Sequence, residues 1–94
     1  MPFPPQTPRP FTDAGVRALN PGQNGCYGLF KQGLWIYVGK GDIRERLLAH
    51  LNGDNPCISQ YAPTHFVSAV TSSMDAEEKA LILELAPVCN KKVG

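Results

Sequence analysis

Three stretches of the chain combine apolar, aromatic and β-branched residues in the short runs that are typical of β-strands. They are residues 25–31 (GCYGLFK), 34–39 (LWIYVG) and 64–71 (THFVSAVT). Only a short segment around a Gln-Gly pair separates the first two, which indicates a β-hairpin. The pattern therefore predicts a small, mainly antiparallel sheet of three strands.

A helical pattern follows the hairpin. Over residues 43–51, Ile43, Leu47 and Leu51 recur every four positions and form one apolar stripe. Asp42 is a good N-cap for this helix, and an Asn-Gly pair ends it. The stripe predicts that this helix packs against the sheet.

Further helical segments are predicted by capping residues and periodicity over residues 12–19, 55–61 and 73–85. The main elements then follow the order β-β-α-β-α, an α/β (α+β) fold in which helices flank the sheet. The first ten residues contain five prolines, which favour an extended and loosely packed arm. We therefore divide the chain into a proline-rich arm with a short helix (residues 1–23) and a single domain (residues 24–94).

The length of the hairpin loop decides on which faces of the sheet two tyrosines lie. A two-residue loop would place Tyr27 and Tyr37 on opposite faces. A three-residue loop, Lys31-Gln32-Gly33, would place them directly opposite each other on one face. Glycine at the third loop position suits the left-handed residue of such a loop, so we expect the three-residue form.

Composition narrows the class of protein but not its function. Of the 94 residues, 43% are apolar and 18% are charged, as in ordinary globular domains, and the net charge is +1. No run is long and apolar enough to span a membrane, and no secretory signal is evident. Three cysteines (Cys26, Cys57 and Cys89) are too few and too scattered for a disulfide framework. We therefore expect free thiols and a cytoplasmic protein.

Glu78 lies among apolar positions of the last predicted helix. At about 100° per residue, it falls within the arc formed by Met74, Leu81, Ile82 and Leu85. A carboxylate on such a face is costly unless it is paired or bound to a cation. It is either one partner of a structural ion pair with an arginine, or a metal ligand or acid/base group at the edge of a cleft.

Arg46 and His50 lie four residues apart on the flank of the predicted helix over residues 43–51. Alone they are ordinary surface charges, yet an arginine is well suited to clamp phosphate oxygens. Tyr27 and Tyr37 each lie close to a glycine, and glycine within a strand often marks the close approach of another group.

Together these residues resemble the GIY-YIG nuclease domain. The first signature is Gly25-Cys26-Tyr27, with cysteine where isoleucine is usual, and the second is Tyr37-Val38-Gly39. The helix that follows carries Arg46 and His50, and the third signature consists of Glu78, Leu81, Ile82, Pro87 and Asn90. The resemblance covers residues 24–90.

The resemblance implies an endonuclease that hydrolyses phosphodiester bonds in DNA, or in RNA, with one divalent metal ion, Mg²⁺ or Mn²⁺. Glu78 would hold the metal, Tyr27 would accept a proton from the attacking water, and Tyr37 would position that water. Arg46 would neutralise phosphate charge and His50 would orient the tyrosine. Residues expected to contact the substrate are Lys40, Arg44 and Asn90. Arg44 is also an alternative to Arg46, because the preceding loop is one residue shorter than in many members.

This mechanism requires Tyr27, Tyr37, Arg46, His50 and Glu78 to line one concave surface. A non-catalytic module that binds nucleic acid or protein is the alternative, and the near-zero net charge favours it, because phosphate contacts supply most non-specific affinity. A domain held by a Glu78–Arg46 ion pair is a third hypothesis. The low charge also predicts that a second copy or an accessory DNA-binding partner helps to hold the substrate.

Overall fold

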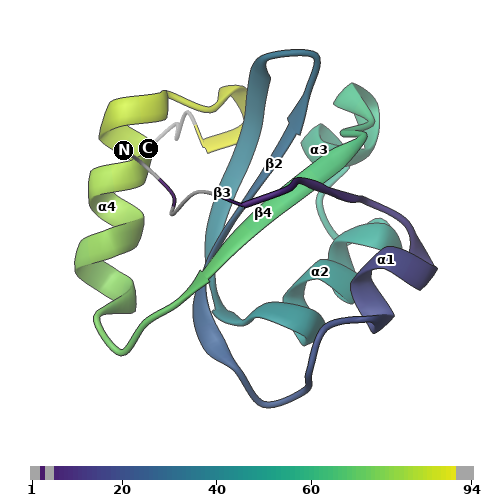
Figure 1. Ribbon diagram of the computed structural model, residues 1–94. Coiled ribbons are helices and arrows are strands. Elements are labelled where there is room, and N and C mark those ends of the chain that lie inside the picture. Colours follow the sequence, from purple (N-terminus) through teal and green to yellow (C-terminus); the bar gives the residue numbers. More distant parts are fainter. Residues whose placement is uncertain (1–2, 4–5, 91–94) are drawn as a thin grey trace.

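A four-stranded antiparallel sheet forms the middle layer of the computed structural model, which describes residues 3 and 6–90. The strands are β1 (Arg9–Pro10), β2 (Asn24–Lys31), β3 (Leu34–Asp42) and β4 (His65–Val70). They lie in the order β1-β4-β2-β3, so β3 is an edge strand (Figure 1). The α+β class is confirmed, whereas the expected three-stranded sheet is wrong because the N-terminal arm adds β1.

Helices cover both faces of the sheet (Figure 1). They are α1 (Asp13–Arg17), α2 (Ile43–Leu51), α3 (Pro56–Tyr61), α4 (Met74–Leu85) and the short 3-10 helix η1 (Val88–Asn90). Helices α1, α2 and α3 share a buried cluster with Tyr27 and Leu29 of β2. Helix α4 packs on the other face, where Leu81 joins Cys26 of β2. Because side chains alternate along a strand, β2 contributes to both layers of the core.

Helix α2 forms where its local sequence signals predicted. The carboxylate of Asp42 accepts a hydrogen bond from the backbone N–H of Glu45, 3.2 Å away, and so caps the first turn. The predicted stripe is buried at Ile43 and Leu47. The helix ends at Leu51, and Gly53 adopts a positive φ of 86° that turns the chain back.

The β2–β3 hairpin corrects the expected register. Its loop has two residues, Gln32 and Gly33, both with positive φ, so Lys31 pairs with Leu34. The expectation of a three-residue loop is therefore wrong. The register then shifts between Leu29 and Phe30, and the extra residue on β3 is a β-bulge.

This bulge determines which face Tyr37 occupies. After the shift, Tyr27 pairs with Gly39, and Leu29 pairs with Tyr37. Leu29 and Tyr27 lie two positions apart on β2 and thus point to the same face. Tyr27 and Tyr37 therefore share a face, as expected, but they are diagonal neighbours rather than direct partners.

The N-terminal arm packs against the sheet. Residues of β1 pair with β4, and the side-chain amide of Gln6 bonds both the N–H and the C=O of Ser68. Phe3 is buried and stacks on Trp35, with ring centroids 5.8 Å apart. The expectation of a loosely packed arm is wrong at these positions, because Phe3 packs on the sheet and Gln6 bonds to the backbone of β4.

Two of the three cysteines form a disulfide, which corrects the expectation of free thiols. Cys57 in α3 is bonded to Cys89 in η1, 32 residues along the chain. Cys26 remains a free, buried thiol. The expected cytoplasmic location rested on free thiols and on the lack of an evident secretory signal, and the disulfide removes the first of these two grounds. Within the described residues, no helix has the length and apolar character needed to span a membrane.

Candidate active site

Tyr27 lies at the centre of the candidate site. It is only 1% exposed, and its hydroxyl group is 2.8 Å from Nε2 of His50. The phenol lies against Gly39 of β3, where a Cβ would be 2.3 Å from the Tyr27 oxygen. The glycine of the second signature is therefore needed to admit the Tyr27 side chain.

His50 links Tyr27 to a carboxylate that the sequence analysis did not identify. Its side chain is 1% exposed, and its Nδ1 is 2.7 Å from Oδ1 of Asp54. Burial lowers the pKa of His50, an effect that the charge of Asp54 partly offsets. The sequence feature that could have identified Asp54 is its position four residues after His50 and directly after Gly53, where the chain turns back.

Arg46 lies one helical turn before His50 on α2 and is 46% exposed. One guanidinium nitrogen, Nη2, is 3.7 Å from Oδ2 of Asp54. Its interaction with the Tyr27 phenol raises the pKa of Arg46. Burial raises the pKa of Tyr27 well above its usual range, and the charge of Arg46 opposes this effect. The Tyr27 phenol is therefore neutral at rest and interacts with a cation that is 46% exposed.

Tyr37 lies beside this cluster. Its ring centroid is 6.3 Å from that of Tyr27 and 5.2 Å from that of His50. Partial burial raises the pKa of Tyr37, and the charge of Glu78 raises it further. Tyr37 is thus a group on which charges from both sides act, Glu78 from α4 and Arg46 from α2.

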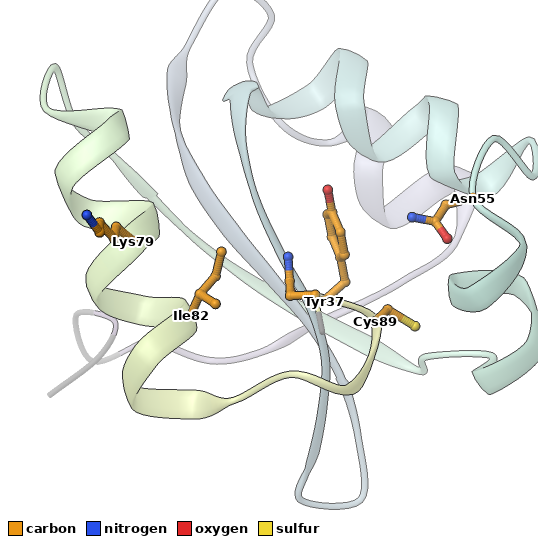
Figure 2. Close-up of a pocket in the computed structure, with 6 residues that line it drawn as sticks. Tyr37, Asn55, Lys79, Ile82 and Cys89 are labelled. Atoms are coloured by element: carbon orange, nitrogen blue, oxygen red, sulfur yellow. The ribbon is translucent and has the colours of Figure 1, made fainter. Parts of the chain in front are cut away.

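A cleft of about 780 Å³ runs beside Tyr37, along the edge strand β3 and between α4 and α3 (Figure 2). Its lining residues are Tyr37, Asn55, Lys79, Ile82, Cys89 and Asn90. Figure 2 shows the phenol of Tyr37 lying between α4 and the loop that carries Asn55. Of the five expected catalytic residues, only Tyr37 lines this cleft.

Glu78 occupies the other side of the site, on α4. It is 22% exposed, and its Oε1 is 3.6 Å from Nζ of Lys40. Burial and then the charge of Glu78 raise the pKa of Cys26 to about 11. The hypothesis that Glu78 pairs with an arginine is wrong, because its observed partner is Lys40. The hypothesis of a Glu78–Arg46 pair is also wrong, since Arg46 pairs with Asp54.

The three residues expected to contact the substrate have different surroundings. Lys40 forms ion pairs with Asp75 and Glu78, and its hydrogen bond to Asp75 raises the pKa of Lys40. Arg44 has a buried Nε with no hydrogen-bond partner among the described residues. The Asn90 amide accepts from the Val38 N–H (2.7 Å) and donates to the Val38 C=O (3.0 Å). Asn90 thus caps part of the free edge of β3.

The resemblance implies a divalent cation, and its expected ligand is Glu78. Among the residues that the structure describes, no three His, Cys, Asp or Glu side chains are grouped in a way that could hold a metal. Mg²⁺ usually keeps several waters and binds through one or two carboxylates together with substrate phosphates. A single accessible carboxylate fits such an ion, if it binds together with a phosphate.

Comparison with known proteins leaves the site to be interpreted from its own chemistry. No protein-family model matches the chain, and no curated protein is similar to it.

Proposed function

We propose that this protein is a metal-dependent endonuclease of the GIY-YIG type, which hydrolyses phosphodiester bonds in DNA or RNA. The observation that supports this most directly is the cluster formed by Tyr27, Tyr37, Arg46 and His50. These residues lie on three elements, and they meet on one face of the sheet. The sequence resemblance required this convergence, whereas core packing accounts for the burial of Tyr27 and Tyr37 but not for the polar contacts of Arg46 and His50.

Arg46 is the group that meets the phosphate. Its side chain is half exposed above Tyr27, so the guanidinium can bind two phosphate oxygens without leaving the cluster. Charge that develops on those oxygens during hydrolysis is stabilised by a cation that folding has already placed.

Tyr27 and His50 handle the proton of the attacking water. The Tyr27 hydroxyl is 2.8 Å from Nε2 of His50, and its interaction with Arg46 lowers the pKa of the phenol. Because Tyr27 is only 1% exposed, the cluster must open beside an Arg46-bound phosphate before this hydroxyl can accept a proton from water. Tyr37 forms the wall between the cluster and the cleft and orients that water.

Glu78 would hold the divalent ion, Mg²⁺ or Mn²⁺. When bound, such an ion stabilises charge on the scissile phosphate and on the leaving oxygen. An ion bound there would compete with Lys40 for this carboxylate, and Lys40, which also pairs with Asp75, lies beside it as a candidate contact to the nucleic-acid backbone. Because the net charge is only +1, a second copy or a DNA-binding partner would help to hold the substrate.

A cleavage assay tests this proposal. Single-stranded, duplex and branched DNA, and single-stranded RNA, are incubated with the protein in Mg²⁺ or Mn²⁺. We expect cleavage that falls by at least about 10²-fold in Tyr27→Phe, Arg46→Ala and Glu78→Gln. Glu77→Gln is the matched control, because Glu77 is the exposed neighbour of Glu78 on α4 and should retain activity. Cleavage that survives all three substitutions would refute the assigned site.

The alternative is a module that binds nucleic acid without cutting it. The deep burial of Tyr27 and the pairing of Glu78 with Lys40 favour it, because both groups are engaged within the protein. Binding of a nucleic acid that Arg46→Ala weakens, without cleavage of any substrate in either metal, would establish this function instead.

A further inference from the structure

We propose that Asp54 is a positioning residue of this site, whose carboxylate holds His50 in the tautomer that can take a proton from Tyr27. The catalytic role of Asp54 in this proposal rests on the proposed hydrolase function. The tautomer of His50 does not, and it can be measured without any reaction.

The tautomer follows from the two contacts of the ring. A carboxylate oxygen only accepts hydrogen bonds, so the 2.7 Å contact with Asp54 requires the hydrogen to be on Nδ1 of His50. In a neutral imidazole Nε2 then carries a lone pair. The hydroxyl of Tyr27, 2.8 Å away, must therefore donate to Nε2. Proton transfer from Tyr27 to His50 thus lies along an existing hydrogen bond.

Burial gives this hydrogen-bond chain a fixed geometry. The imidazole is 1% exposed, whereas Asp54 is 36% exposed and lies at the solvent boundary. The turn at Gly53 returns the chain so that the Asp54 N–H bonds the Ala49 C=O at 3.3 Å. A second carboxylate oxygen of Asp54 faces Arg46, so that one side chain positions both the imidazole and the guanidinium.

The charged and titratable groups around His50 are few. Asp54 raises the pKa of His50 and Arg46 lowers it, and the rings of Tyr27 and Tyr37 face it from β2 and β3. Helix α1 also packs on α2, but its Asp13 and Arg17 form an exposed ion pair with each other. Helix α3 contributes Cys57, which does not titrate because it is in the disulfide.

In the step that we propose, the attacking water gives a proton to the Tyr27 oxygen as its own oxygen bonds to phosphorus. Tyr27 simultaneously passes its hydroxyl proton to Nε2 of His50, so the phenol is neutral before and after. The bond from phosphorus to the leaving oxygen breaks, and that oxygen takes a proton from solvent. The imidazolium, stabilised by the Asp54 carboxylate, then releases its proton to solvent, which balances the cycle.

The first test is the ¹⁵N NMR spectrum of the histidine rings in the intact protein, without substrate or metal. We expect His50 of the parent at neutral pH as the Nδ1–H tautomer, while the exposed His65 serves as the internal reference. Asp54→Ala should shift His50 toward the Nε2–H tautomer. In Asp54→Asn an amide oxygen can still accept from Nδ1–H, so the tautomer should persist while the pKa of His50 falls. Asp13→Asn is the control outside the site.

Activity provides the second readout. Because neutral His50 is the proton acceptor, Asp54→Asn should lower kcat by about 10²-fold and move the acidic limb of the kcat/KM profile to lower pH. A purely structural role would change kcat without moving that limb. The parent as the Nε2–H tautomer, or an Asp54→Ala protein with unchanged His50 signals, would overturn the proposal. The expected tautomers in a protein that cleaves nothing would support the positioning role and refute the proposed function.

Discussion

The two sides of the candidate site are built in different ways. On the α2 side, Tyr27, His50, Asp54 and Arg46 form a continuous chain of contacts, and its inner members are almost completely buried. On the α4 side, Glu78 meets Lys40, and Lys40 meets Asp75, whose side chain is largely exposed. One side is a buried hydrogen-bond network, and the other is a set of surface ion pairs.

This difference separates what folding fixes from what a ligand must arrange. A buried network is held by its surroundings, and any unpaired member carries a desolvation cost. Exposed ion pairs contribute little and exchange partners readily. Under the proposed function, the groups that would handle the proton are in place before substrate arrives, whereas Glu78 and Lys40 would have to rearrange around a metal and a phosphate.

Reduction of the disulfide should have the largest effect on stability, because this bond joins the two sides of the site. It ties α3, which packs beside α2, to η1, which follows α4. Closing a loop of this size stabilises a protein by about 2–4 kcal/mol. We expect reduction to lower Tm by ~10–25 °C, measured by circular dichroism. Cys57→Ser should reproduce the loss without reductant, and Cys26→Ser, which leaves the bond intact, should stay responsive to reductant. An unchanged Tm on reduction would show that the link carries no stability.

Gly39→Ala tests the buried side alone. The new methyl group would lie 2.3 Å from the Tyr27 oxygen, so the phenol must move and break its bond to His50. Overpacking of this kind costs about 1–3 kcal/mol. We expect a lower urea midpoint together with a changed His50 NMR signal. Gly33→Ala is the comparison, because its strain comes from a positive φ with no atom within 4 Å. It should leave the His50 signal unchanged.

The dependence of the unfolding free energy on pH tests the buried α2 side of the site, which contains His50. His50 has a lowered pKa in the folded state, so below about 6.5 the unfolded chain binds a proton that the folded protein does not. Stability should therefore fall as the pH decreases from 7 to 5. Chemical denaturation at each pH should show that His50→Gln removes part of this slope. If stability depended on pH equally in the parent and in His50→Gln, the lowered pKa of buried His50 would be contradicted.

Lys40→Met gives the smallest expected effect on stability, because its ion pairs lie at the surface. Tm should not change measurably. The carboxylate of Glu78 loses its competing cation, however, so its affinity for Mn²⁺ should rise by a factor of about two to five, measured from the free Mn²⁺ signal. Lys79→Met, one turn along from Asp75 on α4, is the control. Equal Mn²⁺ affinities in the parent and Lys40→Met would show that Lys40 does not compete for the site.

The sequence predicted those parts of the structure that are encoded by near neighbours. Helix α2 was predicted with its cap at Asp42, because capping and apolar spacing act within a few residues. The positions of Arg46 and His50 on that helix followed from the same local rules. The clustering of four of the expected residues depended on motif spacing rather than on propensity.

Other features depend on contacts that local patterns do not contain. The bond between Cys57 and Cys89 requires that α3 and η1 meet, and the strand in the arm requires β4 as a partner. Asp54 was missed because its role exists only after the Gly53 turn returns it to His50. The short loop was missed because glycine suits the left-handed position of either turn.

The β-bulge on β3 has a consequence for anyone who re-engineers the hairpin. Paired residues of a ladder share a face, so the bulge alone pairs Tyr37 with Leu29 rather than with Gly28. A turn of another length would leave both phenols on one side, provided that the Lys31–Leu34 pair and the bulge are kept. Erasing the bulge would send the Tyr37 ring to the side of α4 and separate it from His50.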